Sequence, residues 1–109
     1  MNFSEYQKQA WTTAMHPNAG SNYLYPTLGL AGEAGEVANK VKKIERDYGG
    51  VITDEVRATV GAEMGDVLWY LACLATELKL DLGVLAQENI EKLASRKERG
   101  AIVGNGDVR

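Results

Sequence analysis

The sequence predicts an all-α protein, a four-helix bundle in which helices from different subunits pack together in a homo-oligomer. Three observations favour this fold class. Apolar residues recur at helical spacing in four segments, and helix-capping or helix-breaking residues separate these segments. The middle of the third segment is apolar nearly all round. A helix buried on every side in a chain of only 109 residues indicates a subunit interface.

Composition excludes several classes of protein. The chain is 45% hydrophobic and 25% charged, as in ordinary globular proteins, and its net charge of −3 argues against a nucleic-acid-binding surface. The longest apolar run, Val67 to Ala75, is far shorter than the roughly 20 residues that a membrane-spanning helix needs. Cys73 is the only cysteine, so we expect a core residue, no disulfide and, with no apolar leader, a cytoplasmic protein.

The first helix is expected to begin at Ser4, whose hydroxyl can cap it while Gln7 completes a capping box. Pro17 ends this region, and residues 16–22 form a polar loop in which we expect His16 to be solvated. The second helix follows Pro26 and runs to about Tyr48, where two glycines stop it.

The third helix is expected to start after Thr53, an N-cap followed by two acidic residues, and to end near Lys79. Asp81 can cap a fourth helix from Leu82 to about Arg99. The core-facing residues of this helix would be Leu82, Ala86, Ile90 and Leu93, and one flank carries Asn89, Lys92 and Arg96. We therefore expect a helical domain over residues 1–100 and a glycine-rich tail over residues 101–109.

A repeated octamer organises the chain. Residues 30–37 and 60–67 both read apolar, two small residues, Glu, apolar, Gly, acid and Val. Each octamer carries an acidic pair at i and i+3, on one helix flank, so two packed helices would converge the carboxylates of Glu33, Glu36, Glu63 and Asp66. This pattern favours a divalent-metal site over a solvated acidic face. Glycines within both helices indicate close approach of another helix or of a ligand.

These motifs resemble the MazG-like all-α nucleoside triphosphate pyrophosphohydrolases, which are related to the dimeric dUTPases and the dCTP pyrophosphatases. The resemblance rests on Glu-x-x-Glu followed by Glu-x-x-Asp, and extends to the Asn89-x-x-Lys92-Leu93-x-x-Arg96 segment and the Arg99-Gly100 ending. It covers most of the chain from about Tyr25. The first helix and its loop match less clearly.

The resemblance implies hydrolysis of a nucleoside triphosphate, a deoxynucleotide or a noncanonical one, to the monophosphate and pyrophosphate. It also implies Mg²⁺, with Mn²⁺ as a substitute, bound by the four motif acids. Glu36 is our choice for the carboxylate that activates water, although spacing does not separate it from Glu33. The phosphates would contact Lys92 and Arg96, with Asn89 as a hydrogen-bond donor and Lys40 or Lys43 as further candidates.

Similar family members place a pocket-lining residue at the position of Tyr70, which could equally be a half-buried packing residue. Base recognition is expected from the first helix and its loop, with Trp11, His16, Asn18 and Asn22 as candidates. We expect a homodimer or homotetramer. Two alternatives stay open, namely a non-catalytic nucleotide- or metal-binding module of the same fold and a purely structural helical bundle.

Overall fold

The computed structural model describes residues 1–100, which form four helices and no strand. The helices are α1 (Phe3–Trp11), α2 (Leu24–Tyr48), α3 (Asp54–Glu77) and α4 (Leu82–Glu98). The predicted all-α class is therefore confirmed for this part of the chain, and the expected tail at 101–109 lies outside the described residues. Among the helices of residues 1–100, none is long and apolar enough to cross a membrane.

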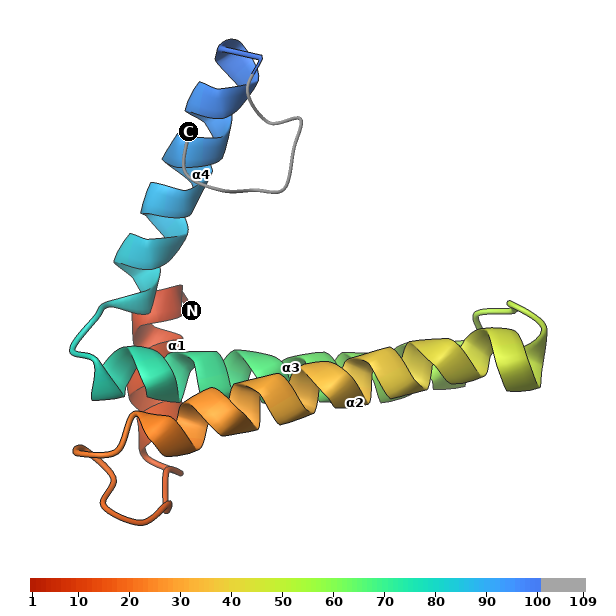
Figure 1. Cartoon of the computed structure of the whole chain (residues 1–109), viewed down its shortest axis with the longest axis horizontal. Helices are drawn as coiled ribbons and strands as arrows, with labels where there is room; N and C mark the ends of the chain where they lie inside the picture. Colours follow the sequence, from red (N-terminus) through yellow and green to blue (C-terminus); the bar gives the residue numbers. More distant parts are fainter. Residues whose placement is uncertain (101–109) are drawn as a thin grey trace.

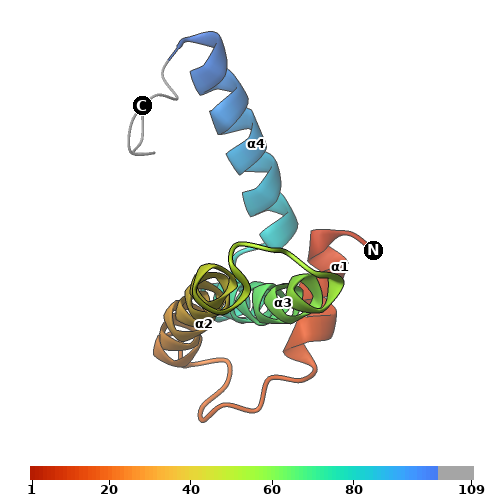
Figure 2. The same cartoon turned by 90° about the vertical axis from the view of Figure 1, so that its right-hand side faces the viewer.

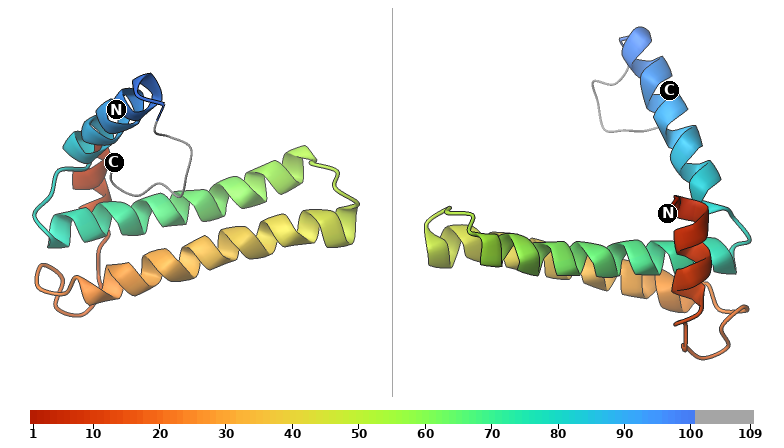
Figure 3. Two further views of the ribbon diagram at one scale, coloured as in Figure 1. Left: turned by 45° about the horizontal axis from the view of Figure 1, so that its top comes forward. Right: turned by 180° about the vertical axis from the view of Figure 1, so that it is seen from behind.

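Helices α2 and α3 form a long antiparallel hairpin, and they lie side by side in both views of Figure 3. Gly49 ends α2 in the left-handed conformation (φ 61°), and the Gly50 N–H donates to the carbonyl of Ile44 at 2.9 Å. The Thr53 hydroxyl accepts a hydrogen bond from the Val56 N–H at 3.1 Å and caps α3, as predicted. Both ends of the connection are thus set by local sequence.

Helix α1 packs across α3 on the side away from α2 (Figure 2). The core at this end consists of buried Ala10, Ala72 and Leu82, with Tyr6, Leu68, Trp69 and Leu85 partly buried around them. Helix α1 therefore covers part of the surface that made the middle of α3 apolar all round. Cys73 is 1% exposed, as expected of a core residue, and its desolvation raises the pKa of the thiol to about 11.

The expected N-cap of α1 was wrong. Asn2 caps the helix by accepting a hydrogen bond from the Glu5 N–H at 2.8 Å, and Ser4 lies inside the first turn. The Ser4 hydroxyl instead donates to the Asp81 carboxylate at 2.7 Å. Asp81 also accepts the Val84 N–H and caps α4, as predicted. The Ser4 hydroxyl thus links α1 to the start of α4.

Gln7 does not form the expected capping box either. Its side-chain amide donates to the Leu80 carbonyl at 2.8 Å and to the Thr76 hydroxyl at 3.0 Å, and its carbonyl oxygen accepts the Leu82 N–H at 2.7 Å. These bonds satisfy backbone groups in the turn between α3 and α4. Gln7 therefore connects three helices, because a partly buried amide can serve as donor and acceptor at once.

Helix α4 projects away from the α2–α3 hairpin (Figure 1). It packs on α1, and the expectation that Ile90 and Leu93 face the core was wrong, since these side chains are 63% and 38% exposed. The Cα radius of gyration is 16.6 Å, whereas a compact chain of this length has about 13 Å. A single copy of the chain leaves much of its apolar surface uncovered.

Candidate metal centre

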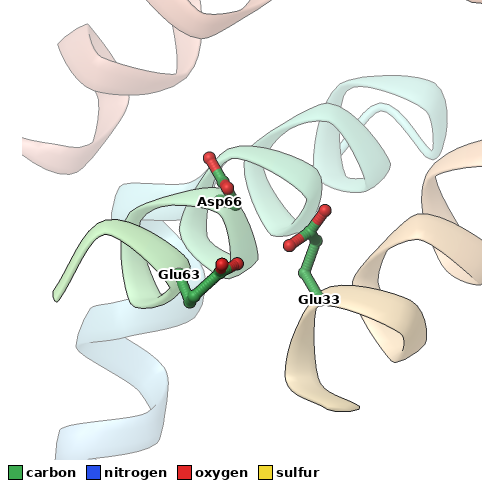
Figure 4. A group of neighbouring side chains, drawn as sticks. All are labelled: Glu33, Glu63 and Asp66. Atoms are coloured by element: carbon green, nitrogen blue, oxygen red, sulfur yellow. The ribbon is translucent and has the colours of Figure 1, made fainter. Parts of the chain in front are cut away.

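Three of the four motif acids converge between α2 and α3. Glu33 projects from α2 toward Glu63 and Asp66 on α3, so that the three carboxylates face one another (Figure 4). One oxygen from each lies within 4.8 Å of the others. Glu33 and Glu63 are half-buried and Asp66 is exposed, so the cluster opens to solvent. Three convergent carboxylate oxygens suit a hard cation such as Mg²⁺.

Glu36, the fourth motif acid, is not part of this three-residue group. It lies one turn after Glu33 on α2 and is exposed. It is nevertheless close enough for its charge to raise the pKa of Glu33. The structure therefore separates Glu36 from the three acids, which spacing in the sequence could not do.

The electrostatics of the cluster favour a cation. Desolvation raises the pKa of Glu33 above its usual value, hydrogen bonding with Glu63 raises it further, and the charge of Asp66 adds to both effects. Like charges at this separation resist simultaneous ionisation. A bound divalent cation would relieve this repulsion and stabilise the ionised carboxylates.

Lys40 and Lys43 lie further along α2, toward its connection with α3. Both are half-buried and line a hollow of about 430 Å³ that Thr53 and Thr59 line from the α3 side. Neither lysine forms an ion pair or hydrogen bond with a side chain of residues 1–100. This hollow therefore holds two lysines outside any ion pair of residues 1–100, although hydrogen bonding to the neighbouring arginine and the charge of Lys43 both lower the pKa of Asp47, which also lines the hollow.

Tyr70 lies on the other side of the acids, toward α1. Its half-buried ring packs directly over the backbone of Gly29, where a Cβ atom would overlap the ring. The ring also makes an edge contact with Trp69, with centroids 5.0 Å apart. The expected close approach at a helix glycine is thus confirmed at Gly29, and both interpretations of Tyr70, pocket wall and packing residue, fit this position.

The predicted phosphate-binding stripe on α4 does not meet the acids within one chain. Asn89 and Lys92 are exposed, Arg96 is 2% exposed, and α4 points away from the hairpin that carries the carboxylates. Asn89 and Lys92 can reach an acidic cluster only if that cluster belongs to another copy of the chain, whereas the side chain of Arg96 is buried within its own copy.

The loop before α2 is built around Glu77, a residue that the sequence analysis did not select. Its carboxylate accepts hydrogen bonds from the His16 Nε2–H at 2.7 Å and from the Gly20 and Asn22 N–H groups at 2.9 and 3.0 Å. The expectation that His16 is solvated was wrong, because its side chain is 2% exposed. In the sequence, the only indication of a role for Glu77 was its position seven residues after Tyr70, on the same flank of α3.

Of the residues considered for base recognition, Trp11 is half-buried and contacts His16 edge-on, with ring centroids 5.9 Å apart. His16 also stacks on Tyr25 at 5.2 Å. Asn22 holds the loop through Pro17 and Glu77. His16 and Asn22 thus hold the loop structure, and Trp11 lies against it.

An apolar groove of about 580 Å³ runs along the opposite flank of the hairpin from the acids. It is lined by Ala34, Val37, Met64, Gly65, Val67, Leu68 and Leu71. Met64 is 58% exposed and Leu71 is 37% exposed. Four helix glycines, at positions 32, 35, 61 and 65, have no atom of the described chain within 4 Å of a Cβ built on them. The close approach expected at these four positions does not occur within the described residues.

Comparison with known proteins identifies the family. The family model described as "MazG nucleotide pyrophosphohydrolase domain" matches residues 23–100, which include both helices that carry the acids. The chain is also 52% identical, over an alignment 114 positions long that covers both chains in full, to the protein named "Gene 37 protein" of Mycobacterium phage L5. No solved structure matches the chain. The chain belongs to the family of MazG nucleotide pyrophosphohydrolase domains.

Proposed function

We propose that this protein hydrolyses a nucleoside triphosphate, either a deoxynucleotide or a noncanonical nucleotide, to the monophosphate and pyrophosphate in an Mg²⁺-dependent reaction. The observation that supports the proposal most strongly is the convergence of Glu33, Glu63 and Asp66 in a chain of this family. An acidic site needs a cation before it can accept a polyphosphate.

Glu33, Glu63 and Asp66 would hold the metal, and their oxygen donors fit Mg²⁺, with Mn²⁺ as a substitute. A bound Mg²⁺ supplies a Lewis acid that polarises phosphate oxygens and lowers the pKa of water. Glu36 lies one turn from Glu33 and outside the three-carboxylate group, which supports its assignment as the carboxylate that is free to act on water.

In the proposed reaction, Glu36 orients a water molecule and accepts one of its protons. The water oxygen forms a bond to the α-phosphorus while the bond from that phosphorus to the bridging oxygen breaks. Pyrophosphate then leaves with the electron pair of the broken bond. Glu33 would replace Glu36 as base only if it were released from the metal.

The predicted phosphate-binding residues of α4 lie far from the acids of their own chain, so their proposed role requires an oligomer. We infer a homodimer or homotetramer, because the apolar groove and the exposed apolar side chains of α4, such as Val84 and Ile90, lack cover in one copy. Asn89 and Lys92 would then contact substrate phosphates in the site of a neighbouring subunit, and Arg96, which is 2% exposed, would join them only if its side chain were uncovered. A cytoplasmic location agrees with a sequence whose one cysteine, the buried Cys73, has no second cysteine for an intramolecular disulfide.

The test is incubation with Mg²⁺ and each ribo- and deoxynucleoside triphosphate, with products separated by ion-exchange chromatography. We expect monophosphate and pyrophosphate from at least one substrate, and no turnover after EDTA treatment. Glu36→Gln and Glu63→Gln should lower kcat by about 100-fold or more. Glu88→Gln on the exposed surface of α4 is the matched control and should keep wild-type activity.

Thermal melting separates loss of catalysis from loss of folding. Glu63→Gln removes a repelling charge, so its melting temperature should equal or exceed that of the wild type. A wild type that turns over nothing, but melts higher with Mg²⁺ and a nonhydrolysable triphosphate, would identify a non-catalytic binding module. A ligand at 100 times its Kd stabilises the folded protein by about 2.7 kcal/mol. A melting temperature that does not change with Mg²⁺ and nucleotide would therefore favour a purely structural bundle.

A further inference from the structure

Glu77 fixes the position of Tyr25 through two routes. The Glu77 carboxylate accepts the His16 Nε2–H at 2.7 Å, and the His16 ring stacks on the Tyr25 ring, with centroids 5.2 Å apart. The same carboxylate accepts the Asn22 N–H at 3.0 Å, and the Asn22 side-chain oxygen accepts the Tyr25 N–H at 3.2 Å. The ring and the backbone of the exposed Tyr25 are therefore both tied to one fully buried side chain.

The Tyr70 ring fills a gap on α2 between Tyr25 and Glu33. Gly29 lies four residues after Tyr25 and four residues before Glu33, so the three positions follow one another along one flank of the helix. Helix neighbours at this spacing have Cβ atoms about 6 Å apart. The Tyr70 ring occupies the place that a Cβ of Gly29 would take. The ring thus lies about one helical turn from Tyr25 and one from Glu33.

The electrostatics of Tyr70 agree with this placement. Burial raises the pKa of the Tyr70 hydroxyl above its usual value, and the neighbouring Tyr25, Glu33 and Asp66 raise it further. Such charge effects require that the groups lie close together. The Tyr70 side chain therefore lies between Tyr25 on one side and the cluster of acids on the other.

We propose that Tyr25 is a positioning residue for the metal centre and that it acts on Glu33 through the ring of Tyr70. This inference rests on the proposed function, because it concerns a carboxylate that would hold the metal. The physical reason is steric. Side chains on a helix lean toward its N-terminus, and on that side of Glu33 the space over Gly29 is taken by the ring. The ring excludes this direction and leaves Glu33 facing the two α3 carboxylates (Figure 4).

Tyr25 supports the ring from the other side. Because Tyr25 is itself fixed by the loop, its side chain keeps the Tyr70 ring from moving toward the start of α2, away from Gly29. A metal ligand that is already held in its binding orientation loses less conformational freedom when the metal binds. Loss of Tyr25 should therefore weaken metal binding although Tyr25 donates no atom to the metal.

The experiment measures Mn²⁺ binding from the electron paramagnetic resonance signal of the free ion, which requires no turnover. Tyr70→Leu should weaken Mn²⁺ binding by about tenfold, because a smaller side chain leaves the space over Gly29 partly empty. Tyr25→Leu should weaken it by about threefold or more. Tyr25→Phe and Tyr70→Phe keep the rings and should bind Mn²⁺ as the wild type does. Tyr23→Leu is the matched control, because Tyr23 is an exposed tyrosine two residues earlier in the chain.

The double variant with Tyr25→Leu and Tyr70→Leu distinguishes action through the ring from a general loss of structure, after a melt has verified that each variant is folded. The double variant should bind Mn²⁺ no more weakly than Tyr70→Leu alone, because the ring is already absent. Effects that multiply, or wild-type affinity in Tyr25→Leu, would overturn the inference, and turnover by the wild type would leave the proposed function standing. Coupled effects on Mn²⁺ binding, in a wild type that hydrolyses nothing, would support the inference while the proposed function fails.

Discussion

Glu77 decides the conformation of the segment between α1 and α2. Its side chain is fully buried, and one carboxylate satisfies His16 and two backbone N–H groups of the loop. Burial by itself would raise the pKa of Glu77, but these hydrogen bonds outweigh burial and hold the pKa below its usual value. The ionised form of Glu77 is therefore part of the folded structure.

Glu77→Gln should destabilise the protein by about 3 kcal/mol at pH 7, because His16 and the two backbone N–H groups would lose the charged acceptor that they bind in the folded state. Since the folded pKa lies below the unfolded one, the contribution of Glu77 is complete above the ordinary glutamate pKa of about 4.3 and is lost as the pH falls through the folded value. Urea unfolding of wild type and variant at pH 7, 5, 4 and 3 measures this difference.

We expect the two stabilities to converge at the acidic end of this series. Glu98→Gln, at the exposed end of α4, is the control and should track the wild type throughout. A difference between wild type and Glu77→Gln that stayed constant with pH would contradict the role of the ionised carboxylate.

Individual residues were predictable where the signal was local. Thr53 and Asp81 cap helices by binding an N–H three residues ahead, and this requires no knowledge of the rest of the fold. Ser4 has the same chemistry, yet its hydroxyl binds Asp81, which is 77 residues away in sequence. The choice between a local and a distant partner depends on which helices meet.

At the scale of elements, the contact between α2 and α3 requires a glycine at position 29 but not at position 32. The Tyr70 ring occupies the space that a Cβ at Gly29 would take, whereas a Cβ at Gly32 would meet no atom of the described chain. Both glycines lie within α2 and share the same intrinsic helix penalty. The two positions therefore form a matched pair for substitution.

Gly29→Ala should destabilise the protein by about 1 to 3 kcal/mol, because the new methyl group forces Tyr70 out of its position against α2. Gly32→Ala should stabilise it by up to about 1 kcal/mol through improved helix propensity. Chemical denaturation of both variants provides the measurement. Equal effects of the two substitutions would show that Tyr70 does not lie against Gly29.

The C-terminal ends of the long helices followed from their end signals, whereas α2 begins at Leu24, two residues before Pro26, and not after Pro26 as expected. Helix α2 was expected to end at about Tyr48 and does so, because Gly49 takes up the left-handed conformation. Helix α3 ends at Glu77, two residues before the expected Lys79. The direction of α4 could not be predicted in this way, since an apolar stripe indicates that a helix is covered but does not identify the covering partner.

At the scale of the molecule, one copy of the chain is extended. The apolar groove along α2 and α3 is open, and α4 carries exposed Ile90. A chain of 109 residues is small enough that uncovered apolar surface is a large fraction of what it has available for stability. This argument supports the proposed homo-oligomer.

Met64→Lys should convert the oligomer to a species with the mass of one chain, 11.9 kDa, because it places a charge in the apolar groove. Met64 is 58% exposed in one copy, so the fold itself should persist. Sedimentation velocity at several concentrations is the measurement. Met15→Lys, at a 91% exposed position in the loop, is the control and should keep the wild-type mass.

A wild type that sediments as a single chain at every concentration would contradict the oligomer, as would a Met64→Lys protein of unchanged mass. In the first case the stripe of Asn89, Lys92 and Arg96 could not contact the acids of another subunit. The phosphate-binding role proposed for that stripe would then fail with it.

The sequence by itself determined the helical class, the C-terminal end of α2 and the two acidic pairs, because caps, breakers and the i, i+3 spacing act within one or two turns. Only the tertiary structure decided that Glu33, Glu63 and Asp66 converge while Glu36 stays apart. The register between two helices controls this outcome, and register depends on packing contacts between distant residues such as Gly29 and Tyr70.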